Sequence, residues 1–169
     1  GDRRLAAAVQ SNLAGVQRDM GSYAAARASY EAAIPELLAV GNPAGATSAR
    51  HGLAMVHRVL GNYEKSLSLS EQAQAEFRAQ GDRRGVAVAI QNMGSVFAML
   101  GDYPSALSAY EEALGVLSAL GERPAVATTL QLLGNVHSSL GDAEQALATY
   151  RRALALQEEI GDQAGAAST

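Results

Sequence analysis

The sequence contains no cysteine and no tryptophan, and its 169 residues include only 2 phenylalanines, 6 tyrosines and 4 prolines. Without cysteine, the chain can form no disulfide, no thiolate zinc site and no thiol nucleophile. The scarcity of large aromatic residues means that a core must be built from alanine, leucine and valine. Small residues of this kind suit helices that approach one another closely.

The sequence also lacks long hydrophobic runs and an excess of positive charge. No segment approaches the roughly 20 apolar residues that span a bilayer, and no basic segment followed by an apolar stretch indicates a secretory signal. The formal net charge is −4, whereas binding to nucleic acid or to an anionic membrane surface requires a basic excess. We therefore expect a cytoplasmic protein that binds neither nucleic acid nor membranes.

Glycine recurs every twenty residues, in two alternating contexts, and this spacing defines a 40-residue repeat made of two halves. The repeats span residues 1–40, 41–80, 81–120 and 121–160, and residues 161–169 begin a fifth. No insertion interrupts them, so we expect a single array over residues 1–169. Because arrays usually end in a capping helix, the chain resembles an excerpt from a longer array. The recurring glycines are Gly1, Gly21, Gly41, Gly61, Gly81, Gly101, Gly121, Gly141 and Gly161.

Each half of a repeat is predicted to be one helix, the last of them at residues 143–160. Glycine ends a helix because it adopts the left-handed conformation without strain, and a short polar residue after it caps the next helix. Helices joined by such short turns pack as antiparallel hairpins, so the fold class is all-α. The expected capping residues are Asp2, Ser22, Asn42, Asn62, Asp82, Asp102, Glu122, Asp142 and Asp162.

Apolar and small residues recur at equivalent positions of the repeats, and we expect these columns to form the core. The first-helix columns are Val16, Val56, Val96 and Val136; Leu13, Leu53, Met93 and Leu133; Met20, Leu60, Leu100 and Leu140; and Ala14, Ala54, Gly94 and Gly134. The second-helix columns are Ala33, Ala73, Ala113 and Ala153, and Tyr30, Tyr110 and Tyr150, which Ser70 interrupts.

These columns resemble the tetratricopeptide repeat, whose pattern is W-x2-L-G-x2-Y followed by A-x3-F. The resemblance implies a right-handed α-solenoid of four helix-turn-helix units plus the start of a fifth. The period of 40 residues is longer than the usual 34 and is similar to repeats of spindle-orientation adaptors, kinesin light chain and bacterial signalling-ATPase sensor regions. Repeat 2 departs from the pattern at Arg50, Ser66 and Ser70. The third repeat carries the pattern at Ile90, Met93, Gly94, Phe97, Ala106 and Tyr110.

The stripe opposite the apolar columns of the first helices is rich in amides, hydroxyls and small residues. Only Arg18, Asp19 and Arg58 in it are charged, whereas a face that merely meets water usually carries more charge. In the family this stripe lines a concave groove, so we expect it to bind a peptide or helix of a partner; the alternative is a solvated face of low charge. The candidate contact residues are Asn12, Arg18, His51, Met55, Arg58, Gln91, Asn92, Ser95, Met99, Gln131, Asn135 and Ser138.

Two arginines and one histidine of this stripe form a candidate basic spot. His51 and Arg58 are two helical turns apart on one face, and Arg18 is the equivalent of Arg58 in the first repeat. Together they suit a carboxylate of the partner, which arginine binds through two parallel hydrogen bonds. The alternative is that Arg18 pairs locally with Asp19. The other histidines, at positions 57 and 137, are expected to be packing residues.

No spacing of residues indicates a catalytic set, a phosphate-binding loop or a metal site, so we expect no enzyme and no cofactor. The leading hypothesis is a protein-interaction scaffold. The alternative is a sensor segment of a larger bacterial signalling protein, which binds a small effector or a neighbouring domain. We also expect end-to-end self-association, because Leu156 and Ile160 lie on a last helix without a following neighbour.

Overall fold

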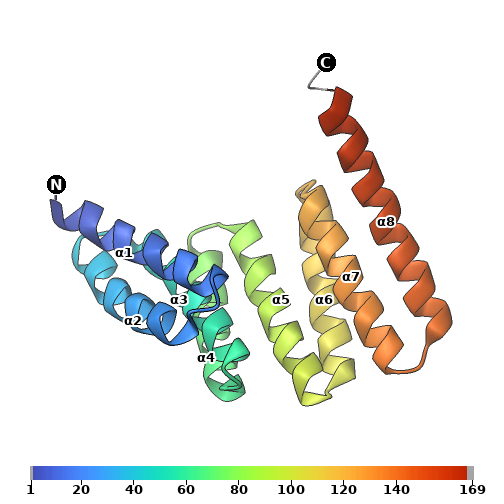
Figure 1. Cartoon of the computed structure of the whole chain (residues 1–169), viewed down its shortest axis with the longest axis horizontal. Helices are drawn as coiled ribbons and strands as arrows, with labels where there is room; N and C mark the ends of the chain where they lie inside the picture. The colour runs from blue at the N-terminus through green and yellow to red at the C-terminus, as the bar shows by residue number, and fades with distance from the viewer. Residues whose placement is uncertain (1, 167–169) are drawn as a thin grey trace. The chain divides into compact units, whose positions relative to one another are not determined.

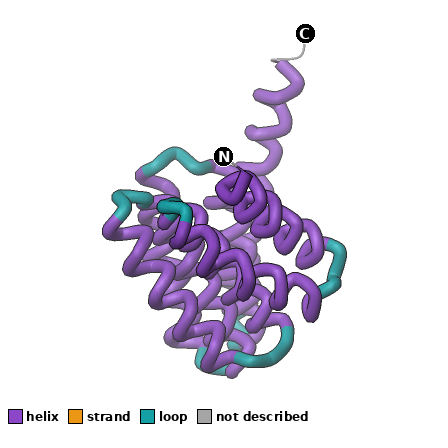
Figure 2. Tube along the Cα trace, turned by 90° about the vertical axis from the view of Figure 1, so that its left-hand side faces the viewer, coloured by secondary structure: helices purple, strands orange, loops and turns teal. Residues whose placement is uncertain are grey.

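The computed structural model describes residues 2–166, and in that part the chain forms eight helices and no strand (Figures 1 and 2). The predicted all-α class is therefore confirmed, and each half-repeat of the first four repeats corresponds to one helix. The helices are α1 (Asp2–Asp19), α2 (Tyr23–Ala39), α3 (Pro43–Val59), α4 (Tyr63–Ala79), α5 (Arg83–Leu100), α6 (Tyr103–Ala119), α7 (Arg123–Ser139) and α8 (Ala143–Ala166).

The chain divides into two compact units, Gly1–Asn92 and Met93–Thr169, whose border falls inside α5. In the N-terminal unit, α2 packs against both α1 and α3, and α3 packs against α4. In the C-terminal unit, α7 packs against both α6 and α8. Consecutive helices within each unit run antiparallel (Figure 1). A helix with neighbours on two sides buries two stripes, which explains why the repeat carries several apolar columns.

The predicted glycine turns are confirmed at each junction between two of the described helices. At Gly21, where φ is 76°, the backbone N–H donates to the carbonyl of Arg18 at 2.9 Å, and the N–H of Ser22 donates to that of Gln17 at 2.8 Å. This pattern satisfies carbonyls that the end of a helix leaves unpaired. The glycines with positive φ are Gly21, Gly41, Gly61, Gly81, Gly101, Gly121 and Gly141.

The predicted capping residues divide into two groups. Three aspartates and one asparagine accept a hydrogen bond from the backbone N–H three residues on, whereas Ser22, Asn62 and Glu122 make no such bond. Asp2 is already the first residue of α1. The amide of Asn62 bonds instead to His57. The capping side chains are those of Asn42, Asp82, Asp102 and Asp142.

The predicted end of the last helix at residue 160 is wrong. Helix α8 continues through Gly161 to Ala166, so the expected fifth repeat is part of α8 as far as that residue, and Asp162 is no cap. Residues 167–169 lie outside the described residues, as does Gly1. Glycine permits a left-handed turn without requiring it.

Most predicted core columns are buried, above all the alanines of the second helices and the valines at 56, 96 and 136. Three expectations fail, one of them at Tyr150 of the second-helix aromatic column, which is 36% exposed. Leu13 and Val16 of α1 are exposed, because α2 and α3 cover only the other side of that helix. The column just before the turn glycines is exposed because its side chains lie at the extreme ends of the helices, beyond the packed turns. Its members are Met20, Leu60, Leu100 and Leu140.

Candidate partner-binding surface

Within the N-terminal unit, α1 and α3 bring four of the candidate residues together. His51, Met55 and Arg58 lie on one face of α3, at spacings of four and three residues. From α1, the Nη1 of Arg18 lies 3.6 Å from the Sδ of Met55. The ring of His51 packs edge-on against Phe77, with the ring centroids 6.3 Å apart. This group, which we call the basic cluster, consists of Arg18, His51, Met55 and Arg58.

The pKa of His51 is affected by both arginines of the basic cluster. Burial, together with the positive charges of Arg18 and Arg58, lowers the pKa of His51 to about 4. The imidazole is therefore neutral at pH 7, and its Nδ1 is buried without a hydrogen-bond partner. The positive charge of the cluster comes from its two arginines, next to a neutral polar ring.

Arg18 has a partner in its own helix. Its Nε and Nη2 both donate to Oδ1 of Asp19, at 3.0 and 2.8 Å. The local pairing considered as the alternative is thus present, although the carboxylate of Asp19 is largely exposed to water. An exposed ion pair contributes little free energy, so a carboxylate of a partner competes with Asp19 at small cost.

Arg58 is held by a buried polar network. Its Nε donates to Oδ1 of Asn92 at 2.8 Å, and the amide of Asn92 donates to the hydroxyls of Ser66 at 3.1 Å and Ser70 at 2.8 Å. Ser66 in turn donates to the carbonyl of Ala54 at 2.8 Å. Asn92 is only 5% exposed, so its expected role as a contact residue is wrong: the helices around it bury its amide, which orients Arg58.

The departures of repeat 2 from the family pattern belong to two polar networks. Arg50, at the position of the family's tryptophan, forms an ion pair with Glu76 of α4. Glu76 also accepts a hydrogen bond from Thr47 at 2.8 Å. Ser66 and Ser70 belong to the network around Asn92. Sequence reasoning missed their role, although one signal was present: Ser70 and Asn92 stand where repeats 1 and 2 have Tyr30 and Gly52.

The candidate residues in the C-terminal unit have different environments. Ser95 is half-buried and accepts a hydrogen bond from the hydroxyl of Tyr110 at 3.0 Å. Asn135 is exposed and accepts one from the hydroxyl of Tyr150 at 2.6 Å. Met99, Gln131 and Ser138 are exposed. Of the remaining candidates in the N-terminal unit, Asn12 is exposed and Gln91 is half-buried.

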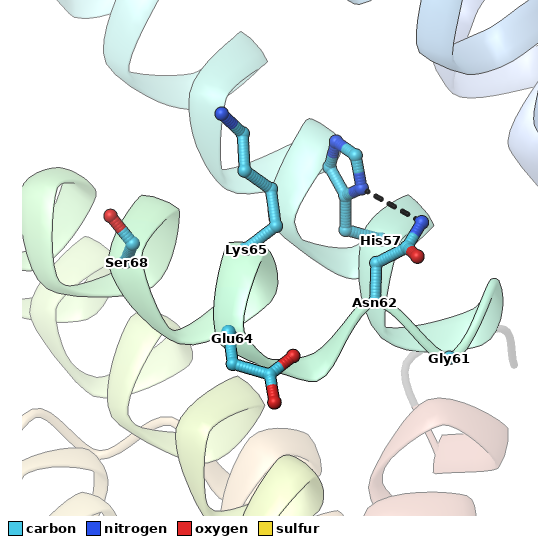
Figure 3. Close-up of a pocket in the computed structure, with 6 residues that line it drawn as sticks. All are labelled: His57, Gly61, Asn62, Glu64, Lys65 and Ser68. Atoms are coloured by element: carbon cyan, nitrogen blue, oxygen red, sulfur yellow. Dashed lines mark hydrogen bonds between the residues drawn. The ribbon is translucent and has the colours of Figure 1, made fainter.

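A separate hollow of about 550 Å³ lies in the N-terminal unit, where α3 ends and α4 begins (Figure 3). His57 and Lys65 point to one side of the ribbon there, and Glu64 points to the other. The Nδ1 of His57 is hydrogen-bonded to Asn62 at 3.3 Å, while its Nε2 is buried without a partner. Burial lowers the pKa of His57, opposed by Glu31 of α2. His57 is buried, as a packing residue would be, and sequence reasoning did not single out this hollow.

Two further kinds of site are absent from the described part of the chain. Within it, no three histidine, aspartate or glutamate side chains gather closely enough to hold a metal ion. None of the described helices combines the length and apolar character that crossing a membrane requires.

Comparison with known families identifies the repeats. A profile of the tetratricopeptide repeat matches residues 45–119 and 116–159, which together make up more than half of the chain. No curated protein matches the chain at a significant level.

Solved structures share the fold at low sequence identity. BtubC (BKLC) from P. vanneervenii is 23% identical with a TM-score of 0.81, over 95% of this chain and 66% of that one. Aspartyl phosphate phosphatase F from Bacillus subtilis is 16% identical with a TM-score of 0.88, over 96% and 43%. A Rap protein complexed with competence and sporulation factor is 17% identical with a TM-score of 0.89, over 96% and 45%. This chain therefore spans from under half to about two thirds of these proteins.

Proposed function

This chain belongs to the tetratricopeptide repeat family, and from that premise we propose that it is an interaction scaffold that binds an acidic peptide or helix of a partner protein. The proposed binding surface is the first-helix stripe, and the proposed anchor is the basic cluster of the N-terminal unit. The proposed role is binding rather than catalysis, in the cytoplasm, with no cofactor.

The observation that carries this proposal is the orientation of Arg58. Its Nε is fixed by Asn92, and Asn92 is fixed by two buried serines. A guanidinium held in this way loses less side-chain entropy when it binds a carboxylate than a free arginine does. Met55, beside Arg18, offers an adaptable apolar contact next to the charges.

The remaining candidate residues suit the backbone of an extended peptide. Amide side chains such as Gln91 and Gln131 carry both donors and acceptors and alternate with small hydroxyl residues along the first helices. The Rap structure of the same fold in complex with competence and sporulation factor supports a binding role for this fold. We propose Asn12, Gln91, Ser95, Met99, Gln131, Asn135 and Ser138 as the further contacts.

The test is a selection from a random-peptide display library against the folded chain, followed by affinity measurements on the enriched peptides. The test variant is Arg18→Glu/Arg58→Glu. The matched control is Arg27→Glu/Arg78→Glu, which makes the same change in net charge at exposed positions of α2 and α4. We expect acidic peptides whose affinity falls at least tenfold in the test variant and stays unchanged in the control. Equal affinities for both variants, with helicity retained, would contradict the proposed anchor.

The hollow beside His57 favours a second candidate function, that of a sensor segment that binds a small effector. Its lining includes His57 and the positively charged Lys65. A thermal-shift screen with small anionic metabolites tests this candidate, with Lys65→Ala as the variant and Lys65→Arg as the charge-retaining control. Stabilisation that disappears in Lys65→Ala alone would favour the sensor, and the absence of any stabilising compound would count against it.

A further inference from the structure

Two tyrosines of the second helices donate their hydroxyls to side chains of the first-helix stripe. The hydroxyl of Tyr110 donates to Ser95 at 3.0 Å, and the hydroxyl of Tyr150 donates to Asn135 at 2.6 Å. In both pairs the acceptor stands 15 residues before the tyrosine. A tyrosine at this position of the repeat therefore directs its hydroxyl to the stripe that is the proposed binding surface.

In the first repeat, Gly15 stands at the position of this acceptor and offers no side chain to the hydroxyl of Tyr30. A Cβ added to Gly15 would lie 3.6 Å from the hydroxyl oxygen, and one added to Gly52 would lie 2.5 Å from it. The hydroxyl thus lies between two glycines, one on α1 and one on α3. Tyr30 is only 4% exposed. Among the residues that the structure describes, none forms a hydrogen bond with this hydroxyl.

Packing explains the glycine at position 52 but not the one at position 15. A Cβ on Gly52 would overlap the ring of Tyr30 at 2.4 Å, whereas the distance of 3.6 Å at Gly15 is an ordinary van der Waals contact. Gly15 lies in the interior of α1, where glycine lowers the stability of a helix relative to serine or alanine. Glycine does permit another molecule to approach the backbone closely, and at this place it does so beside a buried hydroxyl.

The surroundings of the Tyr30 hydroxyl suit a negatively charged acceptor. Arg18 lies one helical turn after Gly15 on the same face of α1, and its Nη1 lies 3.6 Å from the Sδ of Met55 on α3. Burial raises the pKa of Tyr30, and the charge of Arg18 opposes this effect while that of Asp19 adds to it. The phenol is therefore protonated at pH 7 and is a hydrogen-bond donor.

We propose that Tyr30 is a specificity-determining residue of the binding surface. A carboxylate of the partner enters between the two glycines, where one oxygen accepts a hydrogen bond from the hydroxyl of Tyr30 and the other from the guanidinium of Arg18. This inference rests on the proposed function and adds a neutral donor to its charged anchor. Two donors favour a carboxylate over an amide, because the nitrogen of an amide is itself a donor and cannot accept from either group.

The first experiment detects the proposed hydrogen bond by NMR. The folded chain, isotope-labelled at the Cζ atoms of its tyrosines, is titrated with N-acetylglutamate amide at constant ionic strength, and Tyr30→Phe assigns the resonance of Tyr30. We expect this resonance to shift saturably, because the hydroxyl gains an anionic acceptor, whereas the neutral N-acetylglutamine amide should leave it unchanged. A resonance that neither compound shifts, or that both shift equally, would overturn the proposal.

The second experiment separates binding from folding. Tyr30→Phe removes the hydroxyl, Gly15→Ser supplies the internal acceptor that Ser95 provides for Tyr110, and the control Tyr103→Phe removes the hydroxyl of another partly buried tyrosine. With the acidic peptides from the display selection, we expect both test variants to bind about tenfold more weakly, as for the loss of one hydrogen bond to a charged group, and the control to bind normally. Gly15→Ser should also raise the thermal midpoint, so a poorer fold would not explain its weaker binding.

The results distinguish a failure of this inference from a failure of the proposed function. Peptides that lose affinity for Arg18→Glu/Arg58→Glu, but not for Tyr30→Phe or Gly15→Ser, would support the basic cluster as the anchor and overturn the role of Tyr30. A shift of the Tyr30 resonance with the glutamate compound, without any enriched acidic peptide, would support the carboxylate site and contradict the proposed peptide binding.

Discussion

Asn92 donates its side-chain amide to Ser70 at 2.8 Å, and this pair stands where the preceding repeats place Tyr30 against Gly52. A Cβ added to Gly52 would lie 2.4 Å from the ring of Tyr30, so the large tyrosine requires the glycine. In the next pair the second-helix residue is small and the first-helix residue is larger and polar. The two pairs fill equivalent positions with opposite distributions of volume.

This exchange predicts that the destabilising effects of substitutions at Ser70 and Asn92 are not additive, which a double-mutant cycle measures. Ser70→Tyr alone should destabilise the fold by about 1–3 kcal/mol, because the ring overpacks the site that Asn92 occupies. Asn92→Gly alone should also destabilise it, because Arg58 and both serines lose their partner. The double variant recreates the Tyr30–Gly52 pair, so its loss should be smaller than the sum of the two single losses. Urea unfolding midpoints measure all three variants, and additive losses would show that the two positions are independent.

The contact between Gly52 and Tyr30 predicts opposite effects of the same substitution at two glycines. Gly52→Ala should destabilise the fold by about 1–3 kcal/mol, because the new methyl group forces the buried ring to move. Gly115→Ala, within α6 where no atom lies within 4 Å of the new Cβ, should stabilise it by about 0.5–1 kcal/mol through the lower helix propensity of glycine. Thermal midpoints that shift in the same direction for both variants would contradict the close contact between Gly52 and Tyr30.

The lowered pKa of His51 predicts a loss of stability as the pH falls. The unfolded chain binds the proton with a pKa near 6.5 and the folded chain with a pKa of about 4, so stability is complete above pH 6.5 and declines towards pH 4. Between pH 7 and pH 5 the contribution of this group amounts to about 2 kcal/mol. His51→Gln should flatten the pH dependence of the unfolding free energy by that amount. An unchanged slope in the variant would indicate that His51 titrates normally in the fold.

Some of the predicted capping residues make a capping hydrogen bond and others do not, so their substitution by alanine should lower the stability of the fold by unequal amounts. Asn42→Ala should destabilise the fold by about 1 kcal/mol, because the side chain of Asn42 accepts a hydrogen bond from the N–H of Gly45 at 2.9 Å. Ser22→Ala should have a much smaller effect, because the hydroxyl of Ser22 makes no capping bond. Chemical denaturation of the two variants measures the difference, and equal losses would contradict the assignment of Asn42 as a cap.

The periodicity of the chain predicted the repeat boundaries because each turn has a local cause. A glycine adopts the left-handed conformation, and a short polar residue follows it, so helix ends could be assigned without knowledge of packing. Gly161 shows the limit of this reasoning. Its local signal is the same as at Gly121, yet α8 continues through it, because a left-handed turn at glycine is permitted rather than required.

The candidate site was predictable only in part. The spacing of His51 and Arg58 was sufficient to place both on one face of a helix, and their equivalence across repeats placed Arg18 near them. The burial of Asn92 was not predictable in this way, because its equivalents are exposed at Asn12 and fully buried at Gly52. Its environment depends on which side chains the neighbouring helices contribute, and here they contribute two serines.

By itself, the sequence determined the all-α class, the length of the repeat, most helix ends and the alanine and valine columns of the core, because these follow from backbone conformation and from helical periodicity. Only the tertiary structure decided which apolar columns are covered and which polar side chains are buried. Leu13 and Leu133 are the same residue at the same position of their repeats, yet one is exposed and the other buried. Burial is a property of the neighbours that a helix meets, and a pattern within the helix does not contain it.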